Sequence, residues 1–69
     1  MGNINVKYPN IEVELSGQDG NAYMIIGRVS KALRTNGVEE DQIKQFREEA
    51  TSGNYDNLIQ VCNKWVSVY

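Results

Sequence analysis

The sequence predicts a small α+β domain, with one or two strands near its start and three helices after them. Apolar and polar residues alternate over residues 4–16, as in strands with one buried face. Apolar residues then recur at helical spacing in three later segments, which are separated by glycines. We assign residues 1–69 to a single domain, with residues 11–66 as its core and residues 1–9 as a less certain arm or strand.

The alternating segment is expected to form a β-hairpin over residues 4–16. Its apolar positions are Ile4, Val6 and Tyr8, followed by Ile11, Val13 and Leu15. Pro9 and Asn10 lie between the two runs and favour a turn, because proline fixes φ and asparagine tolerates the left-handed region. The alternative is a single strand over residues 11–16, preceded by a loose arm.

A first amphipathic helix is expected over residues 21–35. Its apolar stripe has the spacing i, i+3, i+7 and i+11, formed by Ala22, Ile25, Val29 and Leu33. Asp19 or Asn21 can cap its first turn by accepting from N–H groups that have no partner in the helix. Asn36 and Gly37 are expected to end it, since glycine is the preferred left-handed residue after a helix.

A second helix is expected over residues 39–51, and a third begins near residues 54–56. Acidic residues at the start of the second helix suit the positive end of its dipole. The apolar stripes are Ile43, Phe46 and Ala50 in the second helix, and Tyr55, Leu58, Ile59, Cys62, Trp65 and Val66 in the third. Residues 66–69 alternate again and can add a short strand.

Composition argues against several kinds of function. The 69 residues include no histidine and one cysteine, so neither a catalytic pair with histidine nor a zinc site of Cys and His ligands can form. We therefore expect a protein that is not an enzyme, with no metal and no cofactor, and we interpret Cys62 as a buried hydrophobe. A metal-dependent hydrolase built on Glu12, Glu14 and Asp19 is disfavoured, because outward-facing glutamates are usual in a half-buried strand.

Small size favours an assembled protein. Below roughly 70–80 residues a core is usually supplemented by disulfides, metals or oligomerisation, and only oligomerisation is open to this chain. The sequence has no apolar run near the ~18 residues of a membrane span, and no signal-peptide pattern. We expect a cytoplasmic homo-oligomer with no membrane partner.

A ligand site is predicted around the start of the first helix. The preceding loop, with Gly17, Asp19, Gly20 and Asn21, can offer N–H groups and the positive end of a helix dipole to an anion. An ordinary capped turn is the simpler interpretation, because Asp19 would fill the cradle and repel an anion.

Charge is segregated along the chain, whose net charge is −2. Residues 21–38 carry Arg28, Lys31 and Arg34 with no acid, whereas residues 39–69 carry six acids and three bases. These cations recur every three residues, and we predict that they contact phosphate while Tyr23 stacks on a base. The simpler alternative is that they pair with the acidic second helix or are solvated.

Small residues in the first helix predict a close approach of another backbone or a ligand. Gly27 lies in mid-helix, where it costs about 1 kcal/mol relative to alanine, and it shares a helical row with Ser30. We expect either an oligomer interface at Gly27 and Ser30 or a tight crossing with a helix of the same chain.

A set of short motifs is shared with a protein family. The motifs occupy residues 19–23, 27–29, 31–34, 49–58 and 65–66, and they read Asp-Gly-Asn-Ala-Tyr, Gly-Arg-Val, Lys-Ala-Leu-Arg, Glu-Ala-Thr-Ser-Gly-Asn-Tyr-Asp-Asn-Leu and Trp-Val. In this combination the chain resembles a group of short proteins encoded by phages and other mobile elements. The resemblance implies a phage setting and a small α+β fold, and it supplies no catalytic residues.

Two functions remain as hypotheses. The leading one is a non-enzymatic, phage-type counter-defence protein that binds stoichiometrically, either sequestering a nucleotide immune signal or blocking a host defence protein. The alternative is a small dimeric regulator that binds nucleic acid through its basic first helix. The net charge of −2 counts against the second hypothesis.

Overall fold

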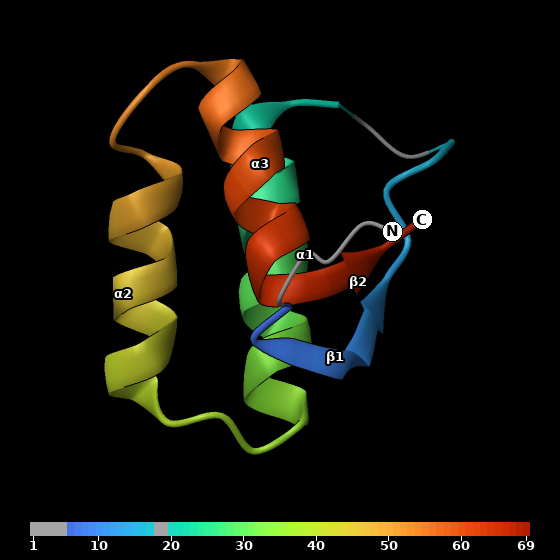
Figure 1. The fold of residues 1–69 in the computed structure, drawn as a ribbon, viewed down its shortest axis with the longest axis vertical. Helices are drawn as coiled ribbons and strands as arrows, with labels where there is room; N and C mark the ends of the chain where they lie inside the picture. Colours follow the sequence, from blue (N-terminus) through green and yellow to red (C-terminus); the bar gives the residue numbers. More distant parts are fainter. Residues whose placement is uncertain (1–5, 18–19) are drawn as a thin grey trace.

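The computed structural model describes residues 6–17 and 20–69, and it has the expected α+β class. In chain order the elements are strand β1 (Tyr8–Val13), helices α1 (Ala22–Thr35), α2 (Glu40–Ala50) and α3 (Tyr55–Trp65), and strand β2 (Val66–Val68). Figure 1 shows the three helices with their long axes roughly aligned and the strands on the side away from α2. The prediction of an N-terminal strand, three helices and a short C-terminal strand is confirmed.

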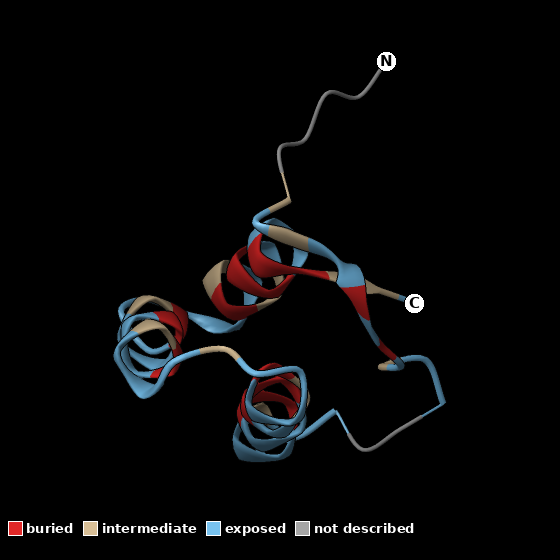
Figure 2. Ribbon diagram, turned by 90° about the horizontal axis from the view of Figure 1, so that it is seen from below, coloured by how far each residue is buried: buried red, intermediate tan, exposed pale blue. Residues whose placement is uncertain are grey.

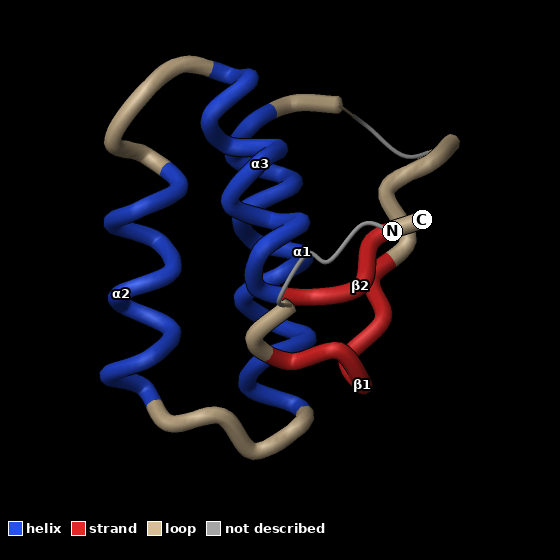
Figure 3. The backbone as a smooth tube through the Cα atoms, viewed as in Figure 1, coloured by secondary structure: helices blue, strands red, loops and turns tan. Residues whose placement is uncertain are grey.

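The two strands form a parallel two-stranded sheet that joins the start of the described chain to its end. Tyr8 is paired with Val66, and Val13 with Val68. The contact continues past the strands, where the N–H of Leu15 donates to the carbonyl oxygen of Tyr69. Because parallel strands need a long crossover, the three helices together form the connection between them (Figure 3).

The predicted hairpin over residues 4–16 is wrong. Pro9 and Asn10 lie within β1, and the pairing register is irregular between Tyr8 and Glu12. Proline has no N–H for a regular ladder and is confined to strand edges and bulges, so these residues produce an irregularity rather than a reversal. Residues 4–5 of the predicted hairpin lie outside the described residues.

Side-chain caps set the starts of α1 and α3. Asn21 Oδ1 accepts a hydrogen bond from the N–H of Tyr23 at 2.8 Å, which confirms Asn21 as a cap. Asn54 Oδ1 accepts from the N–H of Asn57 at 3.0 Å in the same way. After α1, Gly37 has φ +83°, the left-handed conformation expected of a glycine that ends a helix.

The core lies where the three helices and the sheet meet. Figure 2 shows that the buried residues of each helix face the other elements and that the exposed residues face outward. The apolar side chains of the α2 stripe are buried as predicted. Among the described residues, Val29, Leu33, Phe46 and Cys62 have no exposed surface. In the described parts of the chain, no helix is long and apolar enough to span a bilayer.

Tyr55 differs from the predicted core stripe of α3, because its side chain is 47% exposed. It is the first residue of α3, so it lies at the end of the packed helices rather than between them. Its hydroxyl donates to the carbonyl oxygen of Gly20 at 2.8 Å. Tyr55 therefore ties the start of α3 to the loop before α1.

Candidate functional site

The side of α1 that faces away from the core carries large apolar and basic side chains. Tyr23 is 84% exposed and Met24 is 51% exposed. Arg28 and Lys31 are also exposed, and with Met24 and Gly27 they line a shallow hollow of about 270 Å³. We call these five residues the α1 outer face.

Three members of the α1 outer face are spaced four residues apart. Tyr23, Gly27 and Lys31 therefore follow one another along nearly the same side of the helix, with about 12 Å of helix between the first and the last. Gly27 has no side chain, and a Cβ atom added there would meet nothing within 4 Å. The row thus consists of an aromatic ring, an open stretch of backbone and a cation.

A groove adjoins the aromatic end of this row. It has a volume of about 270 Å³ and lies between the starts of α1 and α3 and the end of α2. Its walls include Tyr23, Ile26, Tyr55 and Leu58, so most of the lining is apolar. Tyr23 stands at the junction of the groove and the α1 outer face, and the two together could hold a ligand with an apolar part and a charged part.

Arg34, the third predicted phosphate contact, is engaged elsewhere. Its Nε donates to Glu40 Oε2 at 2.8 Å, and its Nη2 donates to Glu40 Oε1 at 3.2 Å. The hydrogen bond from Arg34 is the main cause of a lowered pKa for the Glu40 carboxyl. For Arg34 the simpler expectation of pairing with the second helix is confirmed, and Arg34 does not line the hollow with Arg28 and Lys31.

The loop before α1 offers an anion fewer donors than the sequence suggests. The N–H of Tyr23, one of the donors that an anion would use, is occupied by the side chain of Asn21. Gly17 has φ +75°, a conformation that favours glycine, and the carbonyl oxygen of Gly20 accepts from the Tyr55 hydroxyl. Both residues therefore contribute to the structure of the loop. Asp19 lies outside the described residues. In its described part the loop fits the simpler interpretation of a capped turn.

Gly27 and Ser30 do not share a small-residue surface. Gly27 is exposed with open space around it, whereas Ser30 is buried. A tight crossing of Gly27 with another helix of this chain is therefore wrong. The oligomer interface at Gly27 and Ser30 stays a prediction.

Two glycine substitutions should have opposite effects on stability. Gly27→Ala should raise the free energy of unfolding by about 0.8–1 kcal/mol, because alanine is the better helix former and its Cβ has room. Gly37→Ala should lower it by about 1–2 kcal/mol, because a Cβ is strained at φ +83°. Urea unfolding followed by circular dichroism measures both changes. Destabilisation by Gly27→Ala would show that a second chain packs on Gly27.

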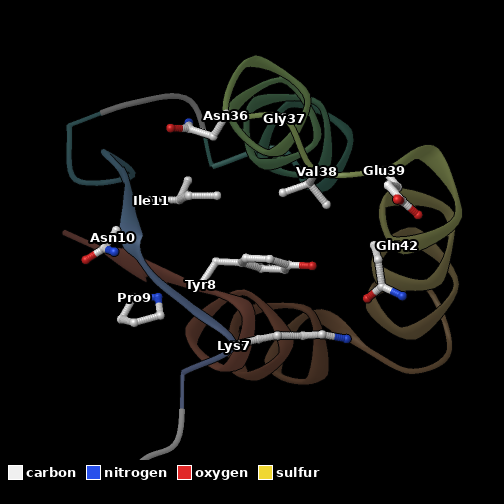
Figure 4. Close-up of a pocket in the computed structure, with 10 residues that line it drawn as sticks. All are labelled: Lys7, Tyr8, Pro9, Asn10, Ile11, Asn36, Gly37, Val38, Glu39 and Gln42. Carbon is white, nitrogen blue, oxygen red and sulfur yellow. The ribbon is translucent and has the colours of Figure 1, made fainter.

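A larger cleft lies on another side of the molecule, between β1 and the turn that joins α1 to α2 (Figure 4). Its volume is about 510 Å³, and the lining residues are Lys7, Tyr8, Pro9, Asn10, Ile11, Asn36, Gly37, Val38, Glu39 and Gln42. No pattern in the sequence predicts this cleft. It is built from segments far apart in the chain, and it depends on the packing of β1 beside α1 and α2.

An aromatic cluster supports one wall of the cleft. The ring centroids of Tyr8 and Trp65 are 6.0 Å apart, and those of Phe46 and Trp65 are 5.7 Å apart in an edge-on arrangement. The ammonium nitrogen of Lys7 lies 4.3 Å from the centroid of the Trp65 ring. The indole N–H of Trp65 donates to Glu49 Oε1 at 3.0 Å, so β1, α2 and α3 meet at this one side chain.

The Glu49 carboxyl gives stability a pH dependence. Its pKa is lowered chiefly by the hydrogen bond from Trp65, with smaller contributions that include the charges of Lys7 and Lys64. A lowered pKa in the folded state adds stability above the pKa of the unfolded state, and this stability is lost as pH falls through the folded-state pKa.

We therefore expect the free energy of unfolding to fall as the pH drops below the usual pKa of a glutamate, and to fall more steeply in the unchanged protein than in Glu49→Gln. Glutamine keeps an acceptor oxygen for the Trp65 indole but does not titrate. Urea unfolding at a series of pH values compares the two proteins, and parallel curves would contradict a folded-state role for the ionised carboxylate. The Glu40 carboxyl is present in both proteins and cancels in the comparison.

The buried cysteine and the acidic side chains were the other candidates for reactive chemistry. Burial raises the pKa of the Cys62 thiol to about 11, so it is protonated at neutral pH and behaves as the predicted buried hydrophobe. Within residues 6–17 and 20–69, no three acidic or cysteine side chains gather where they could hold a metal ion. Asp19, one of the acids of the disfavoured hydrolase, is not among these residues.

Comparisons of the chain with protein-family models, with curated proteins and with solved structures found no match.

Proposed function

We propose that this protein is a non-enzymatic binding protein that acts stoichiometrically and sequesters a phosphate-bearing nucleotide on the α1 outer face. The observation that carries the proposal is the row of exposed Tyr23, open Gly27 and exposed Lys31, with Arg28 beside it. The base stacks on Tyr23 at the edge of the apolar groove, the sugar crosses Gly27, and the phosphates reach Arg28 and Lys31. Arg34 has no part in binding, because Glu40 holds it.

The face is one-sided, which favours an assembled form of the protein. A nucleotide on a single helix surface keeps much of its own surface in water, whereas small-molecule sites usually enclose most of their ligand. A second copy of the chain that packs over the ligand would supply the missing wall. The proposed protein is therefore a homo-oligomer with the ligand between copies.

The biological setting follows from the family resemblance and is part of the proposal. Short accessory proteins of phages act mainly by stoichiometric binding, so a nucleotide sponge in the host cytoplasm serves as counter-defence against an immune signal. Blocking of a host defence protein is the other form of the same role, with the acidic side of α2 as the contact surface.

One observation favours the alternative of a nucleic-acid-binding regulator. The ion pair between Arg34 and Glu40 brings the basic side of α1 next to the start of α2. Lys44 and Arg47 also line a shallow depression on α2. A duplex bound across α1 and α2 would use Arg28 and Lys31 of α1 together with Lys44 and Arg47 of α2 as phosphate contacts.

Calorimetry separates these functions. We expect saturable heat with a cyclic dinucleotide or with ADP-ribose, at a ratio of one ligand per chain or per pair of chains. No heat with any nucleotide of such a panel would remove the sponge and leave the protein-blocking form. Binding of duplex DNA that weakens steeply with salt, without nucleotide binding, would instead support the regulator.

A further inference from the structure

We propose that the cleft between β1 and the α1–α2 turn is a second ligand site, suited to a flat, neutral heteroaromatic ring that carries an N–H donor. This proposal does not rest on nucleotide binding, because the cleft shares no residue with the α1 outer face. Its two supports are the shape of the cleft and a shielded acceptor at one end.

The shape of the cleft favours a flat ligand. Figure 4 shows the Tyr8 ring lying across the cleft, with Ile11 and Val38 on the opposite side. The Tyr8 ring packs beside the buried Trp65 ring, with their centroids 6.0 Å apart. A planar ring fits between an aromatic face and two branched aliphatic side chains, and a volume of about 510 Å³ is ample for one or two fused rings.

The acceptor is the side-chain oxygen of Gln42. This atom is shielded from solvent and, in the described structure, has no hydrogen-bond donor. Figure 4 shows the oxygen on the side of the amide that faces Tyr8 and Lys7. A buried oxygen without a donor is costly. Because the oxygen is shielded, the Gln42 amide must turn toward the cleft that it lines before a ligand N–H can meet it, and that contact then removes the cost.

The charges at the rim favour a neutral ligand. Lys7 and Glu39 both line the cleft and bring opposite charges to it. Lys7 is held against the face of the Trp65 ring, so it is already engaged by the aromatic cluster. A neutral donor meets no net charge in such a site, whereas an anion would be opposed by Glu39 and a cation by Lys7.

Indole and benzofuran test the proposal, because they have the same shape and only indole carries an N–H. Each is titrated into ¹⁵N-labelled protein while amide signals are followed by NMR. Indole should cause saturable shifts at Tyr8, Val38 and the side-chain amide of Gln42, and benzofuran should bind at the same residues roughly fivefold more weakly. Equal affinities for indole and benzofuran would contradict the proposed hydrogen bond to Gln42. Shifts confined to residues outside the cleft would contradict the proposed site.

A substitution pair adds a matched control. Gln42→Leu removes the acceptor and should abolish the preference for indole, whereas Gln60→Leu on the exposed side of α3 should keep it. A preference that survives in Gln42→Leu would contradict the role of Gln42. If Gln42→Leu does not fold, the comparison of indole with benzofuran in the unchanged protein decides. Nucleotide binding is measured by the amide signals of Tyr23 and Lys31, which do not line the cleft. The nucleotide site and the cleft site can therefore be contradicted independently of each other.

Discussion

Replacing Trp65 with alanine is expected to unfold most of the protein at room temperature. Trp65 is 3% exposed and is the side chain on which Tyr8, Phe46, Lys7 and Glu49 converge. Removing a buried aromatic residue costs about 3–5 kcal/mol, because apolar burial is lost and a cavity remains. A single core in a domain of this size rarely supplies more than about 3–5 kcal/mol, so little stability would be left.

The conservative substitution Trp65→Phe is the control. Phenylalanine keeps a ring against Tyr8 and Phe46 but loses the indole N–H that donates to Glu49. The expected loss is about 1–3 kcal/mol, which leaves a folded protein with a lower urea midpoint. Far-UV circular dichroism measures both variants without depending on tryptophan fluorescence. A Trp65→Ala protein within about 1 kcal/mol of the unchanged one would contradict the central place of this side chain.

Reversing the charges of Arg28 and Lys31 together should weaken nucleotide binding by at least about a hundredfold. Each cation in the proposed site makes a charge-assisted contact with phosphate, and such contacts contribute about 1.5–3 kcal/mol each. The loss of two contacts therefore exceeds a factor of a hundred, and repulsion by the new carboxylates increases it. Calorimetric titration of Arg28→Glu/Lys31→Glu with ADP-ribose and with a cyclic dinucleotide measures the change.

The matched control reverses the same number of charges elsewhere. Lys44→Glu/Lys64→Glu changes the net charge equally on α2 and α3, so it should leave nucleotide affinity within a fewfold of the original. Equal losses in the two double variants would point to a nonspecific charge effect. A loss of DNA binding in the Lys44/Lys64 variant would favour a nucleic-acid surface that extends over α2.

The helices could be predicted because their signals are local. The apolar stripe of α1, the cap at Asn21 and the left-handed Gly37 depend on residues within a few positions of one another, and all three are present. The pairing of β1 was not predictable in this way. Its partner is at the other end of the chain, as shown by Ser67, which donates to the carbonyl oxygen of Pro9 across 58 positions. A strand pattern fixes which face is buried but not which strand lies beside it.

The candidate sites also include residues grouped by local sequence and residues brought together only by tertiary contacts. Tyr23 and Lys31 share one side of α1 because helical spacing requires it, so the sequence was sufficient to group them. Arg34 does not belong to this group, because it forms an ion pair with Glu40 of α2. That pairing depends on how α1 and α2 pack against each other, which the spacing within one helix does not determine. The cleft between Tyr8, Val38 and Gln42 has no local pattern in the sequence, because its three segments are far apart in the chain and meet only in the folded protein.

Nucleotide binding at the α1 outer face is tested most directly by mapping a bound nucleotide on the unchanged protein by NMR. ¹⁵N-labelled protein is titrated with ADP-ribose and, separately, with a cyclic dinucleotide. If the nucleotide binds on the α1 outer face, at least one of the two nucleotides should cause saturable shifts of amide signals that are largest at Tyr23, Gly27 and Lys31. Absence of shifts with both nucleotides, or shifts centred on β1 and the cleft at Tyr8, would contradict it.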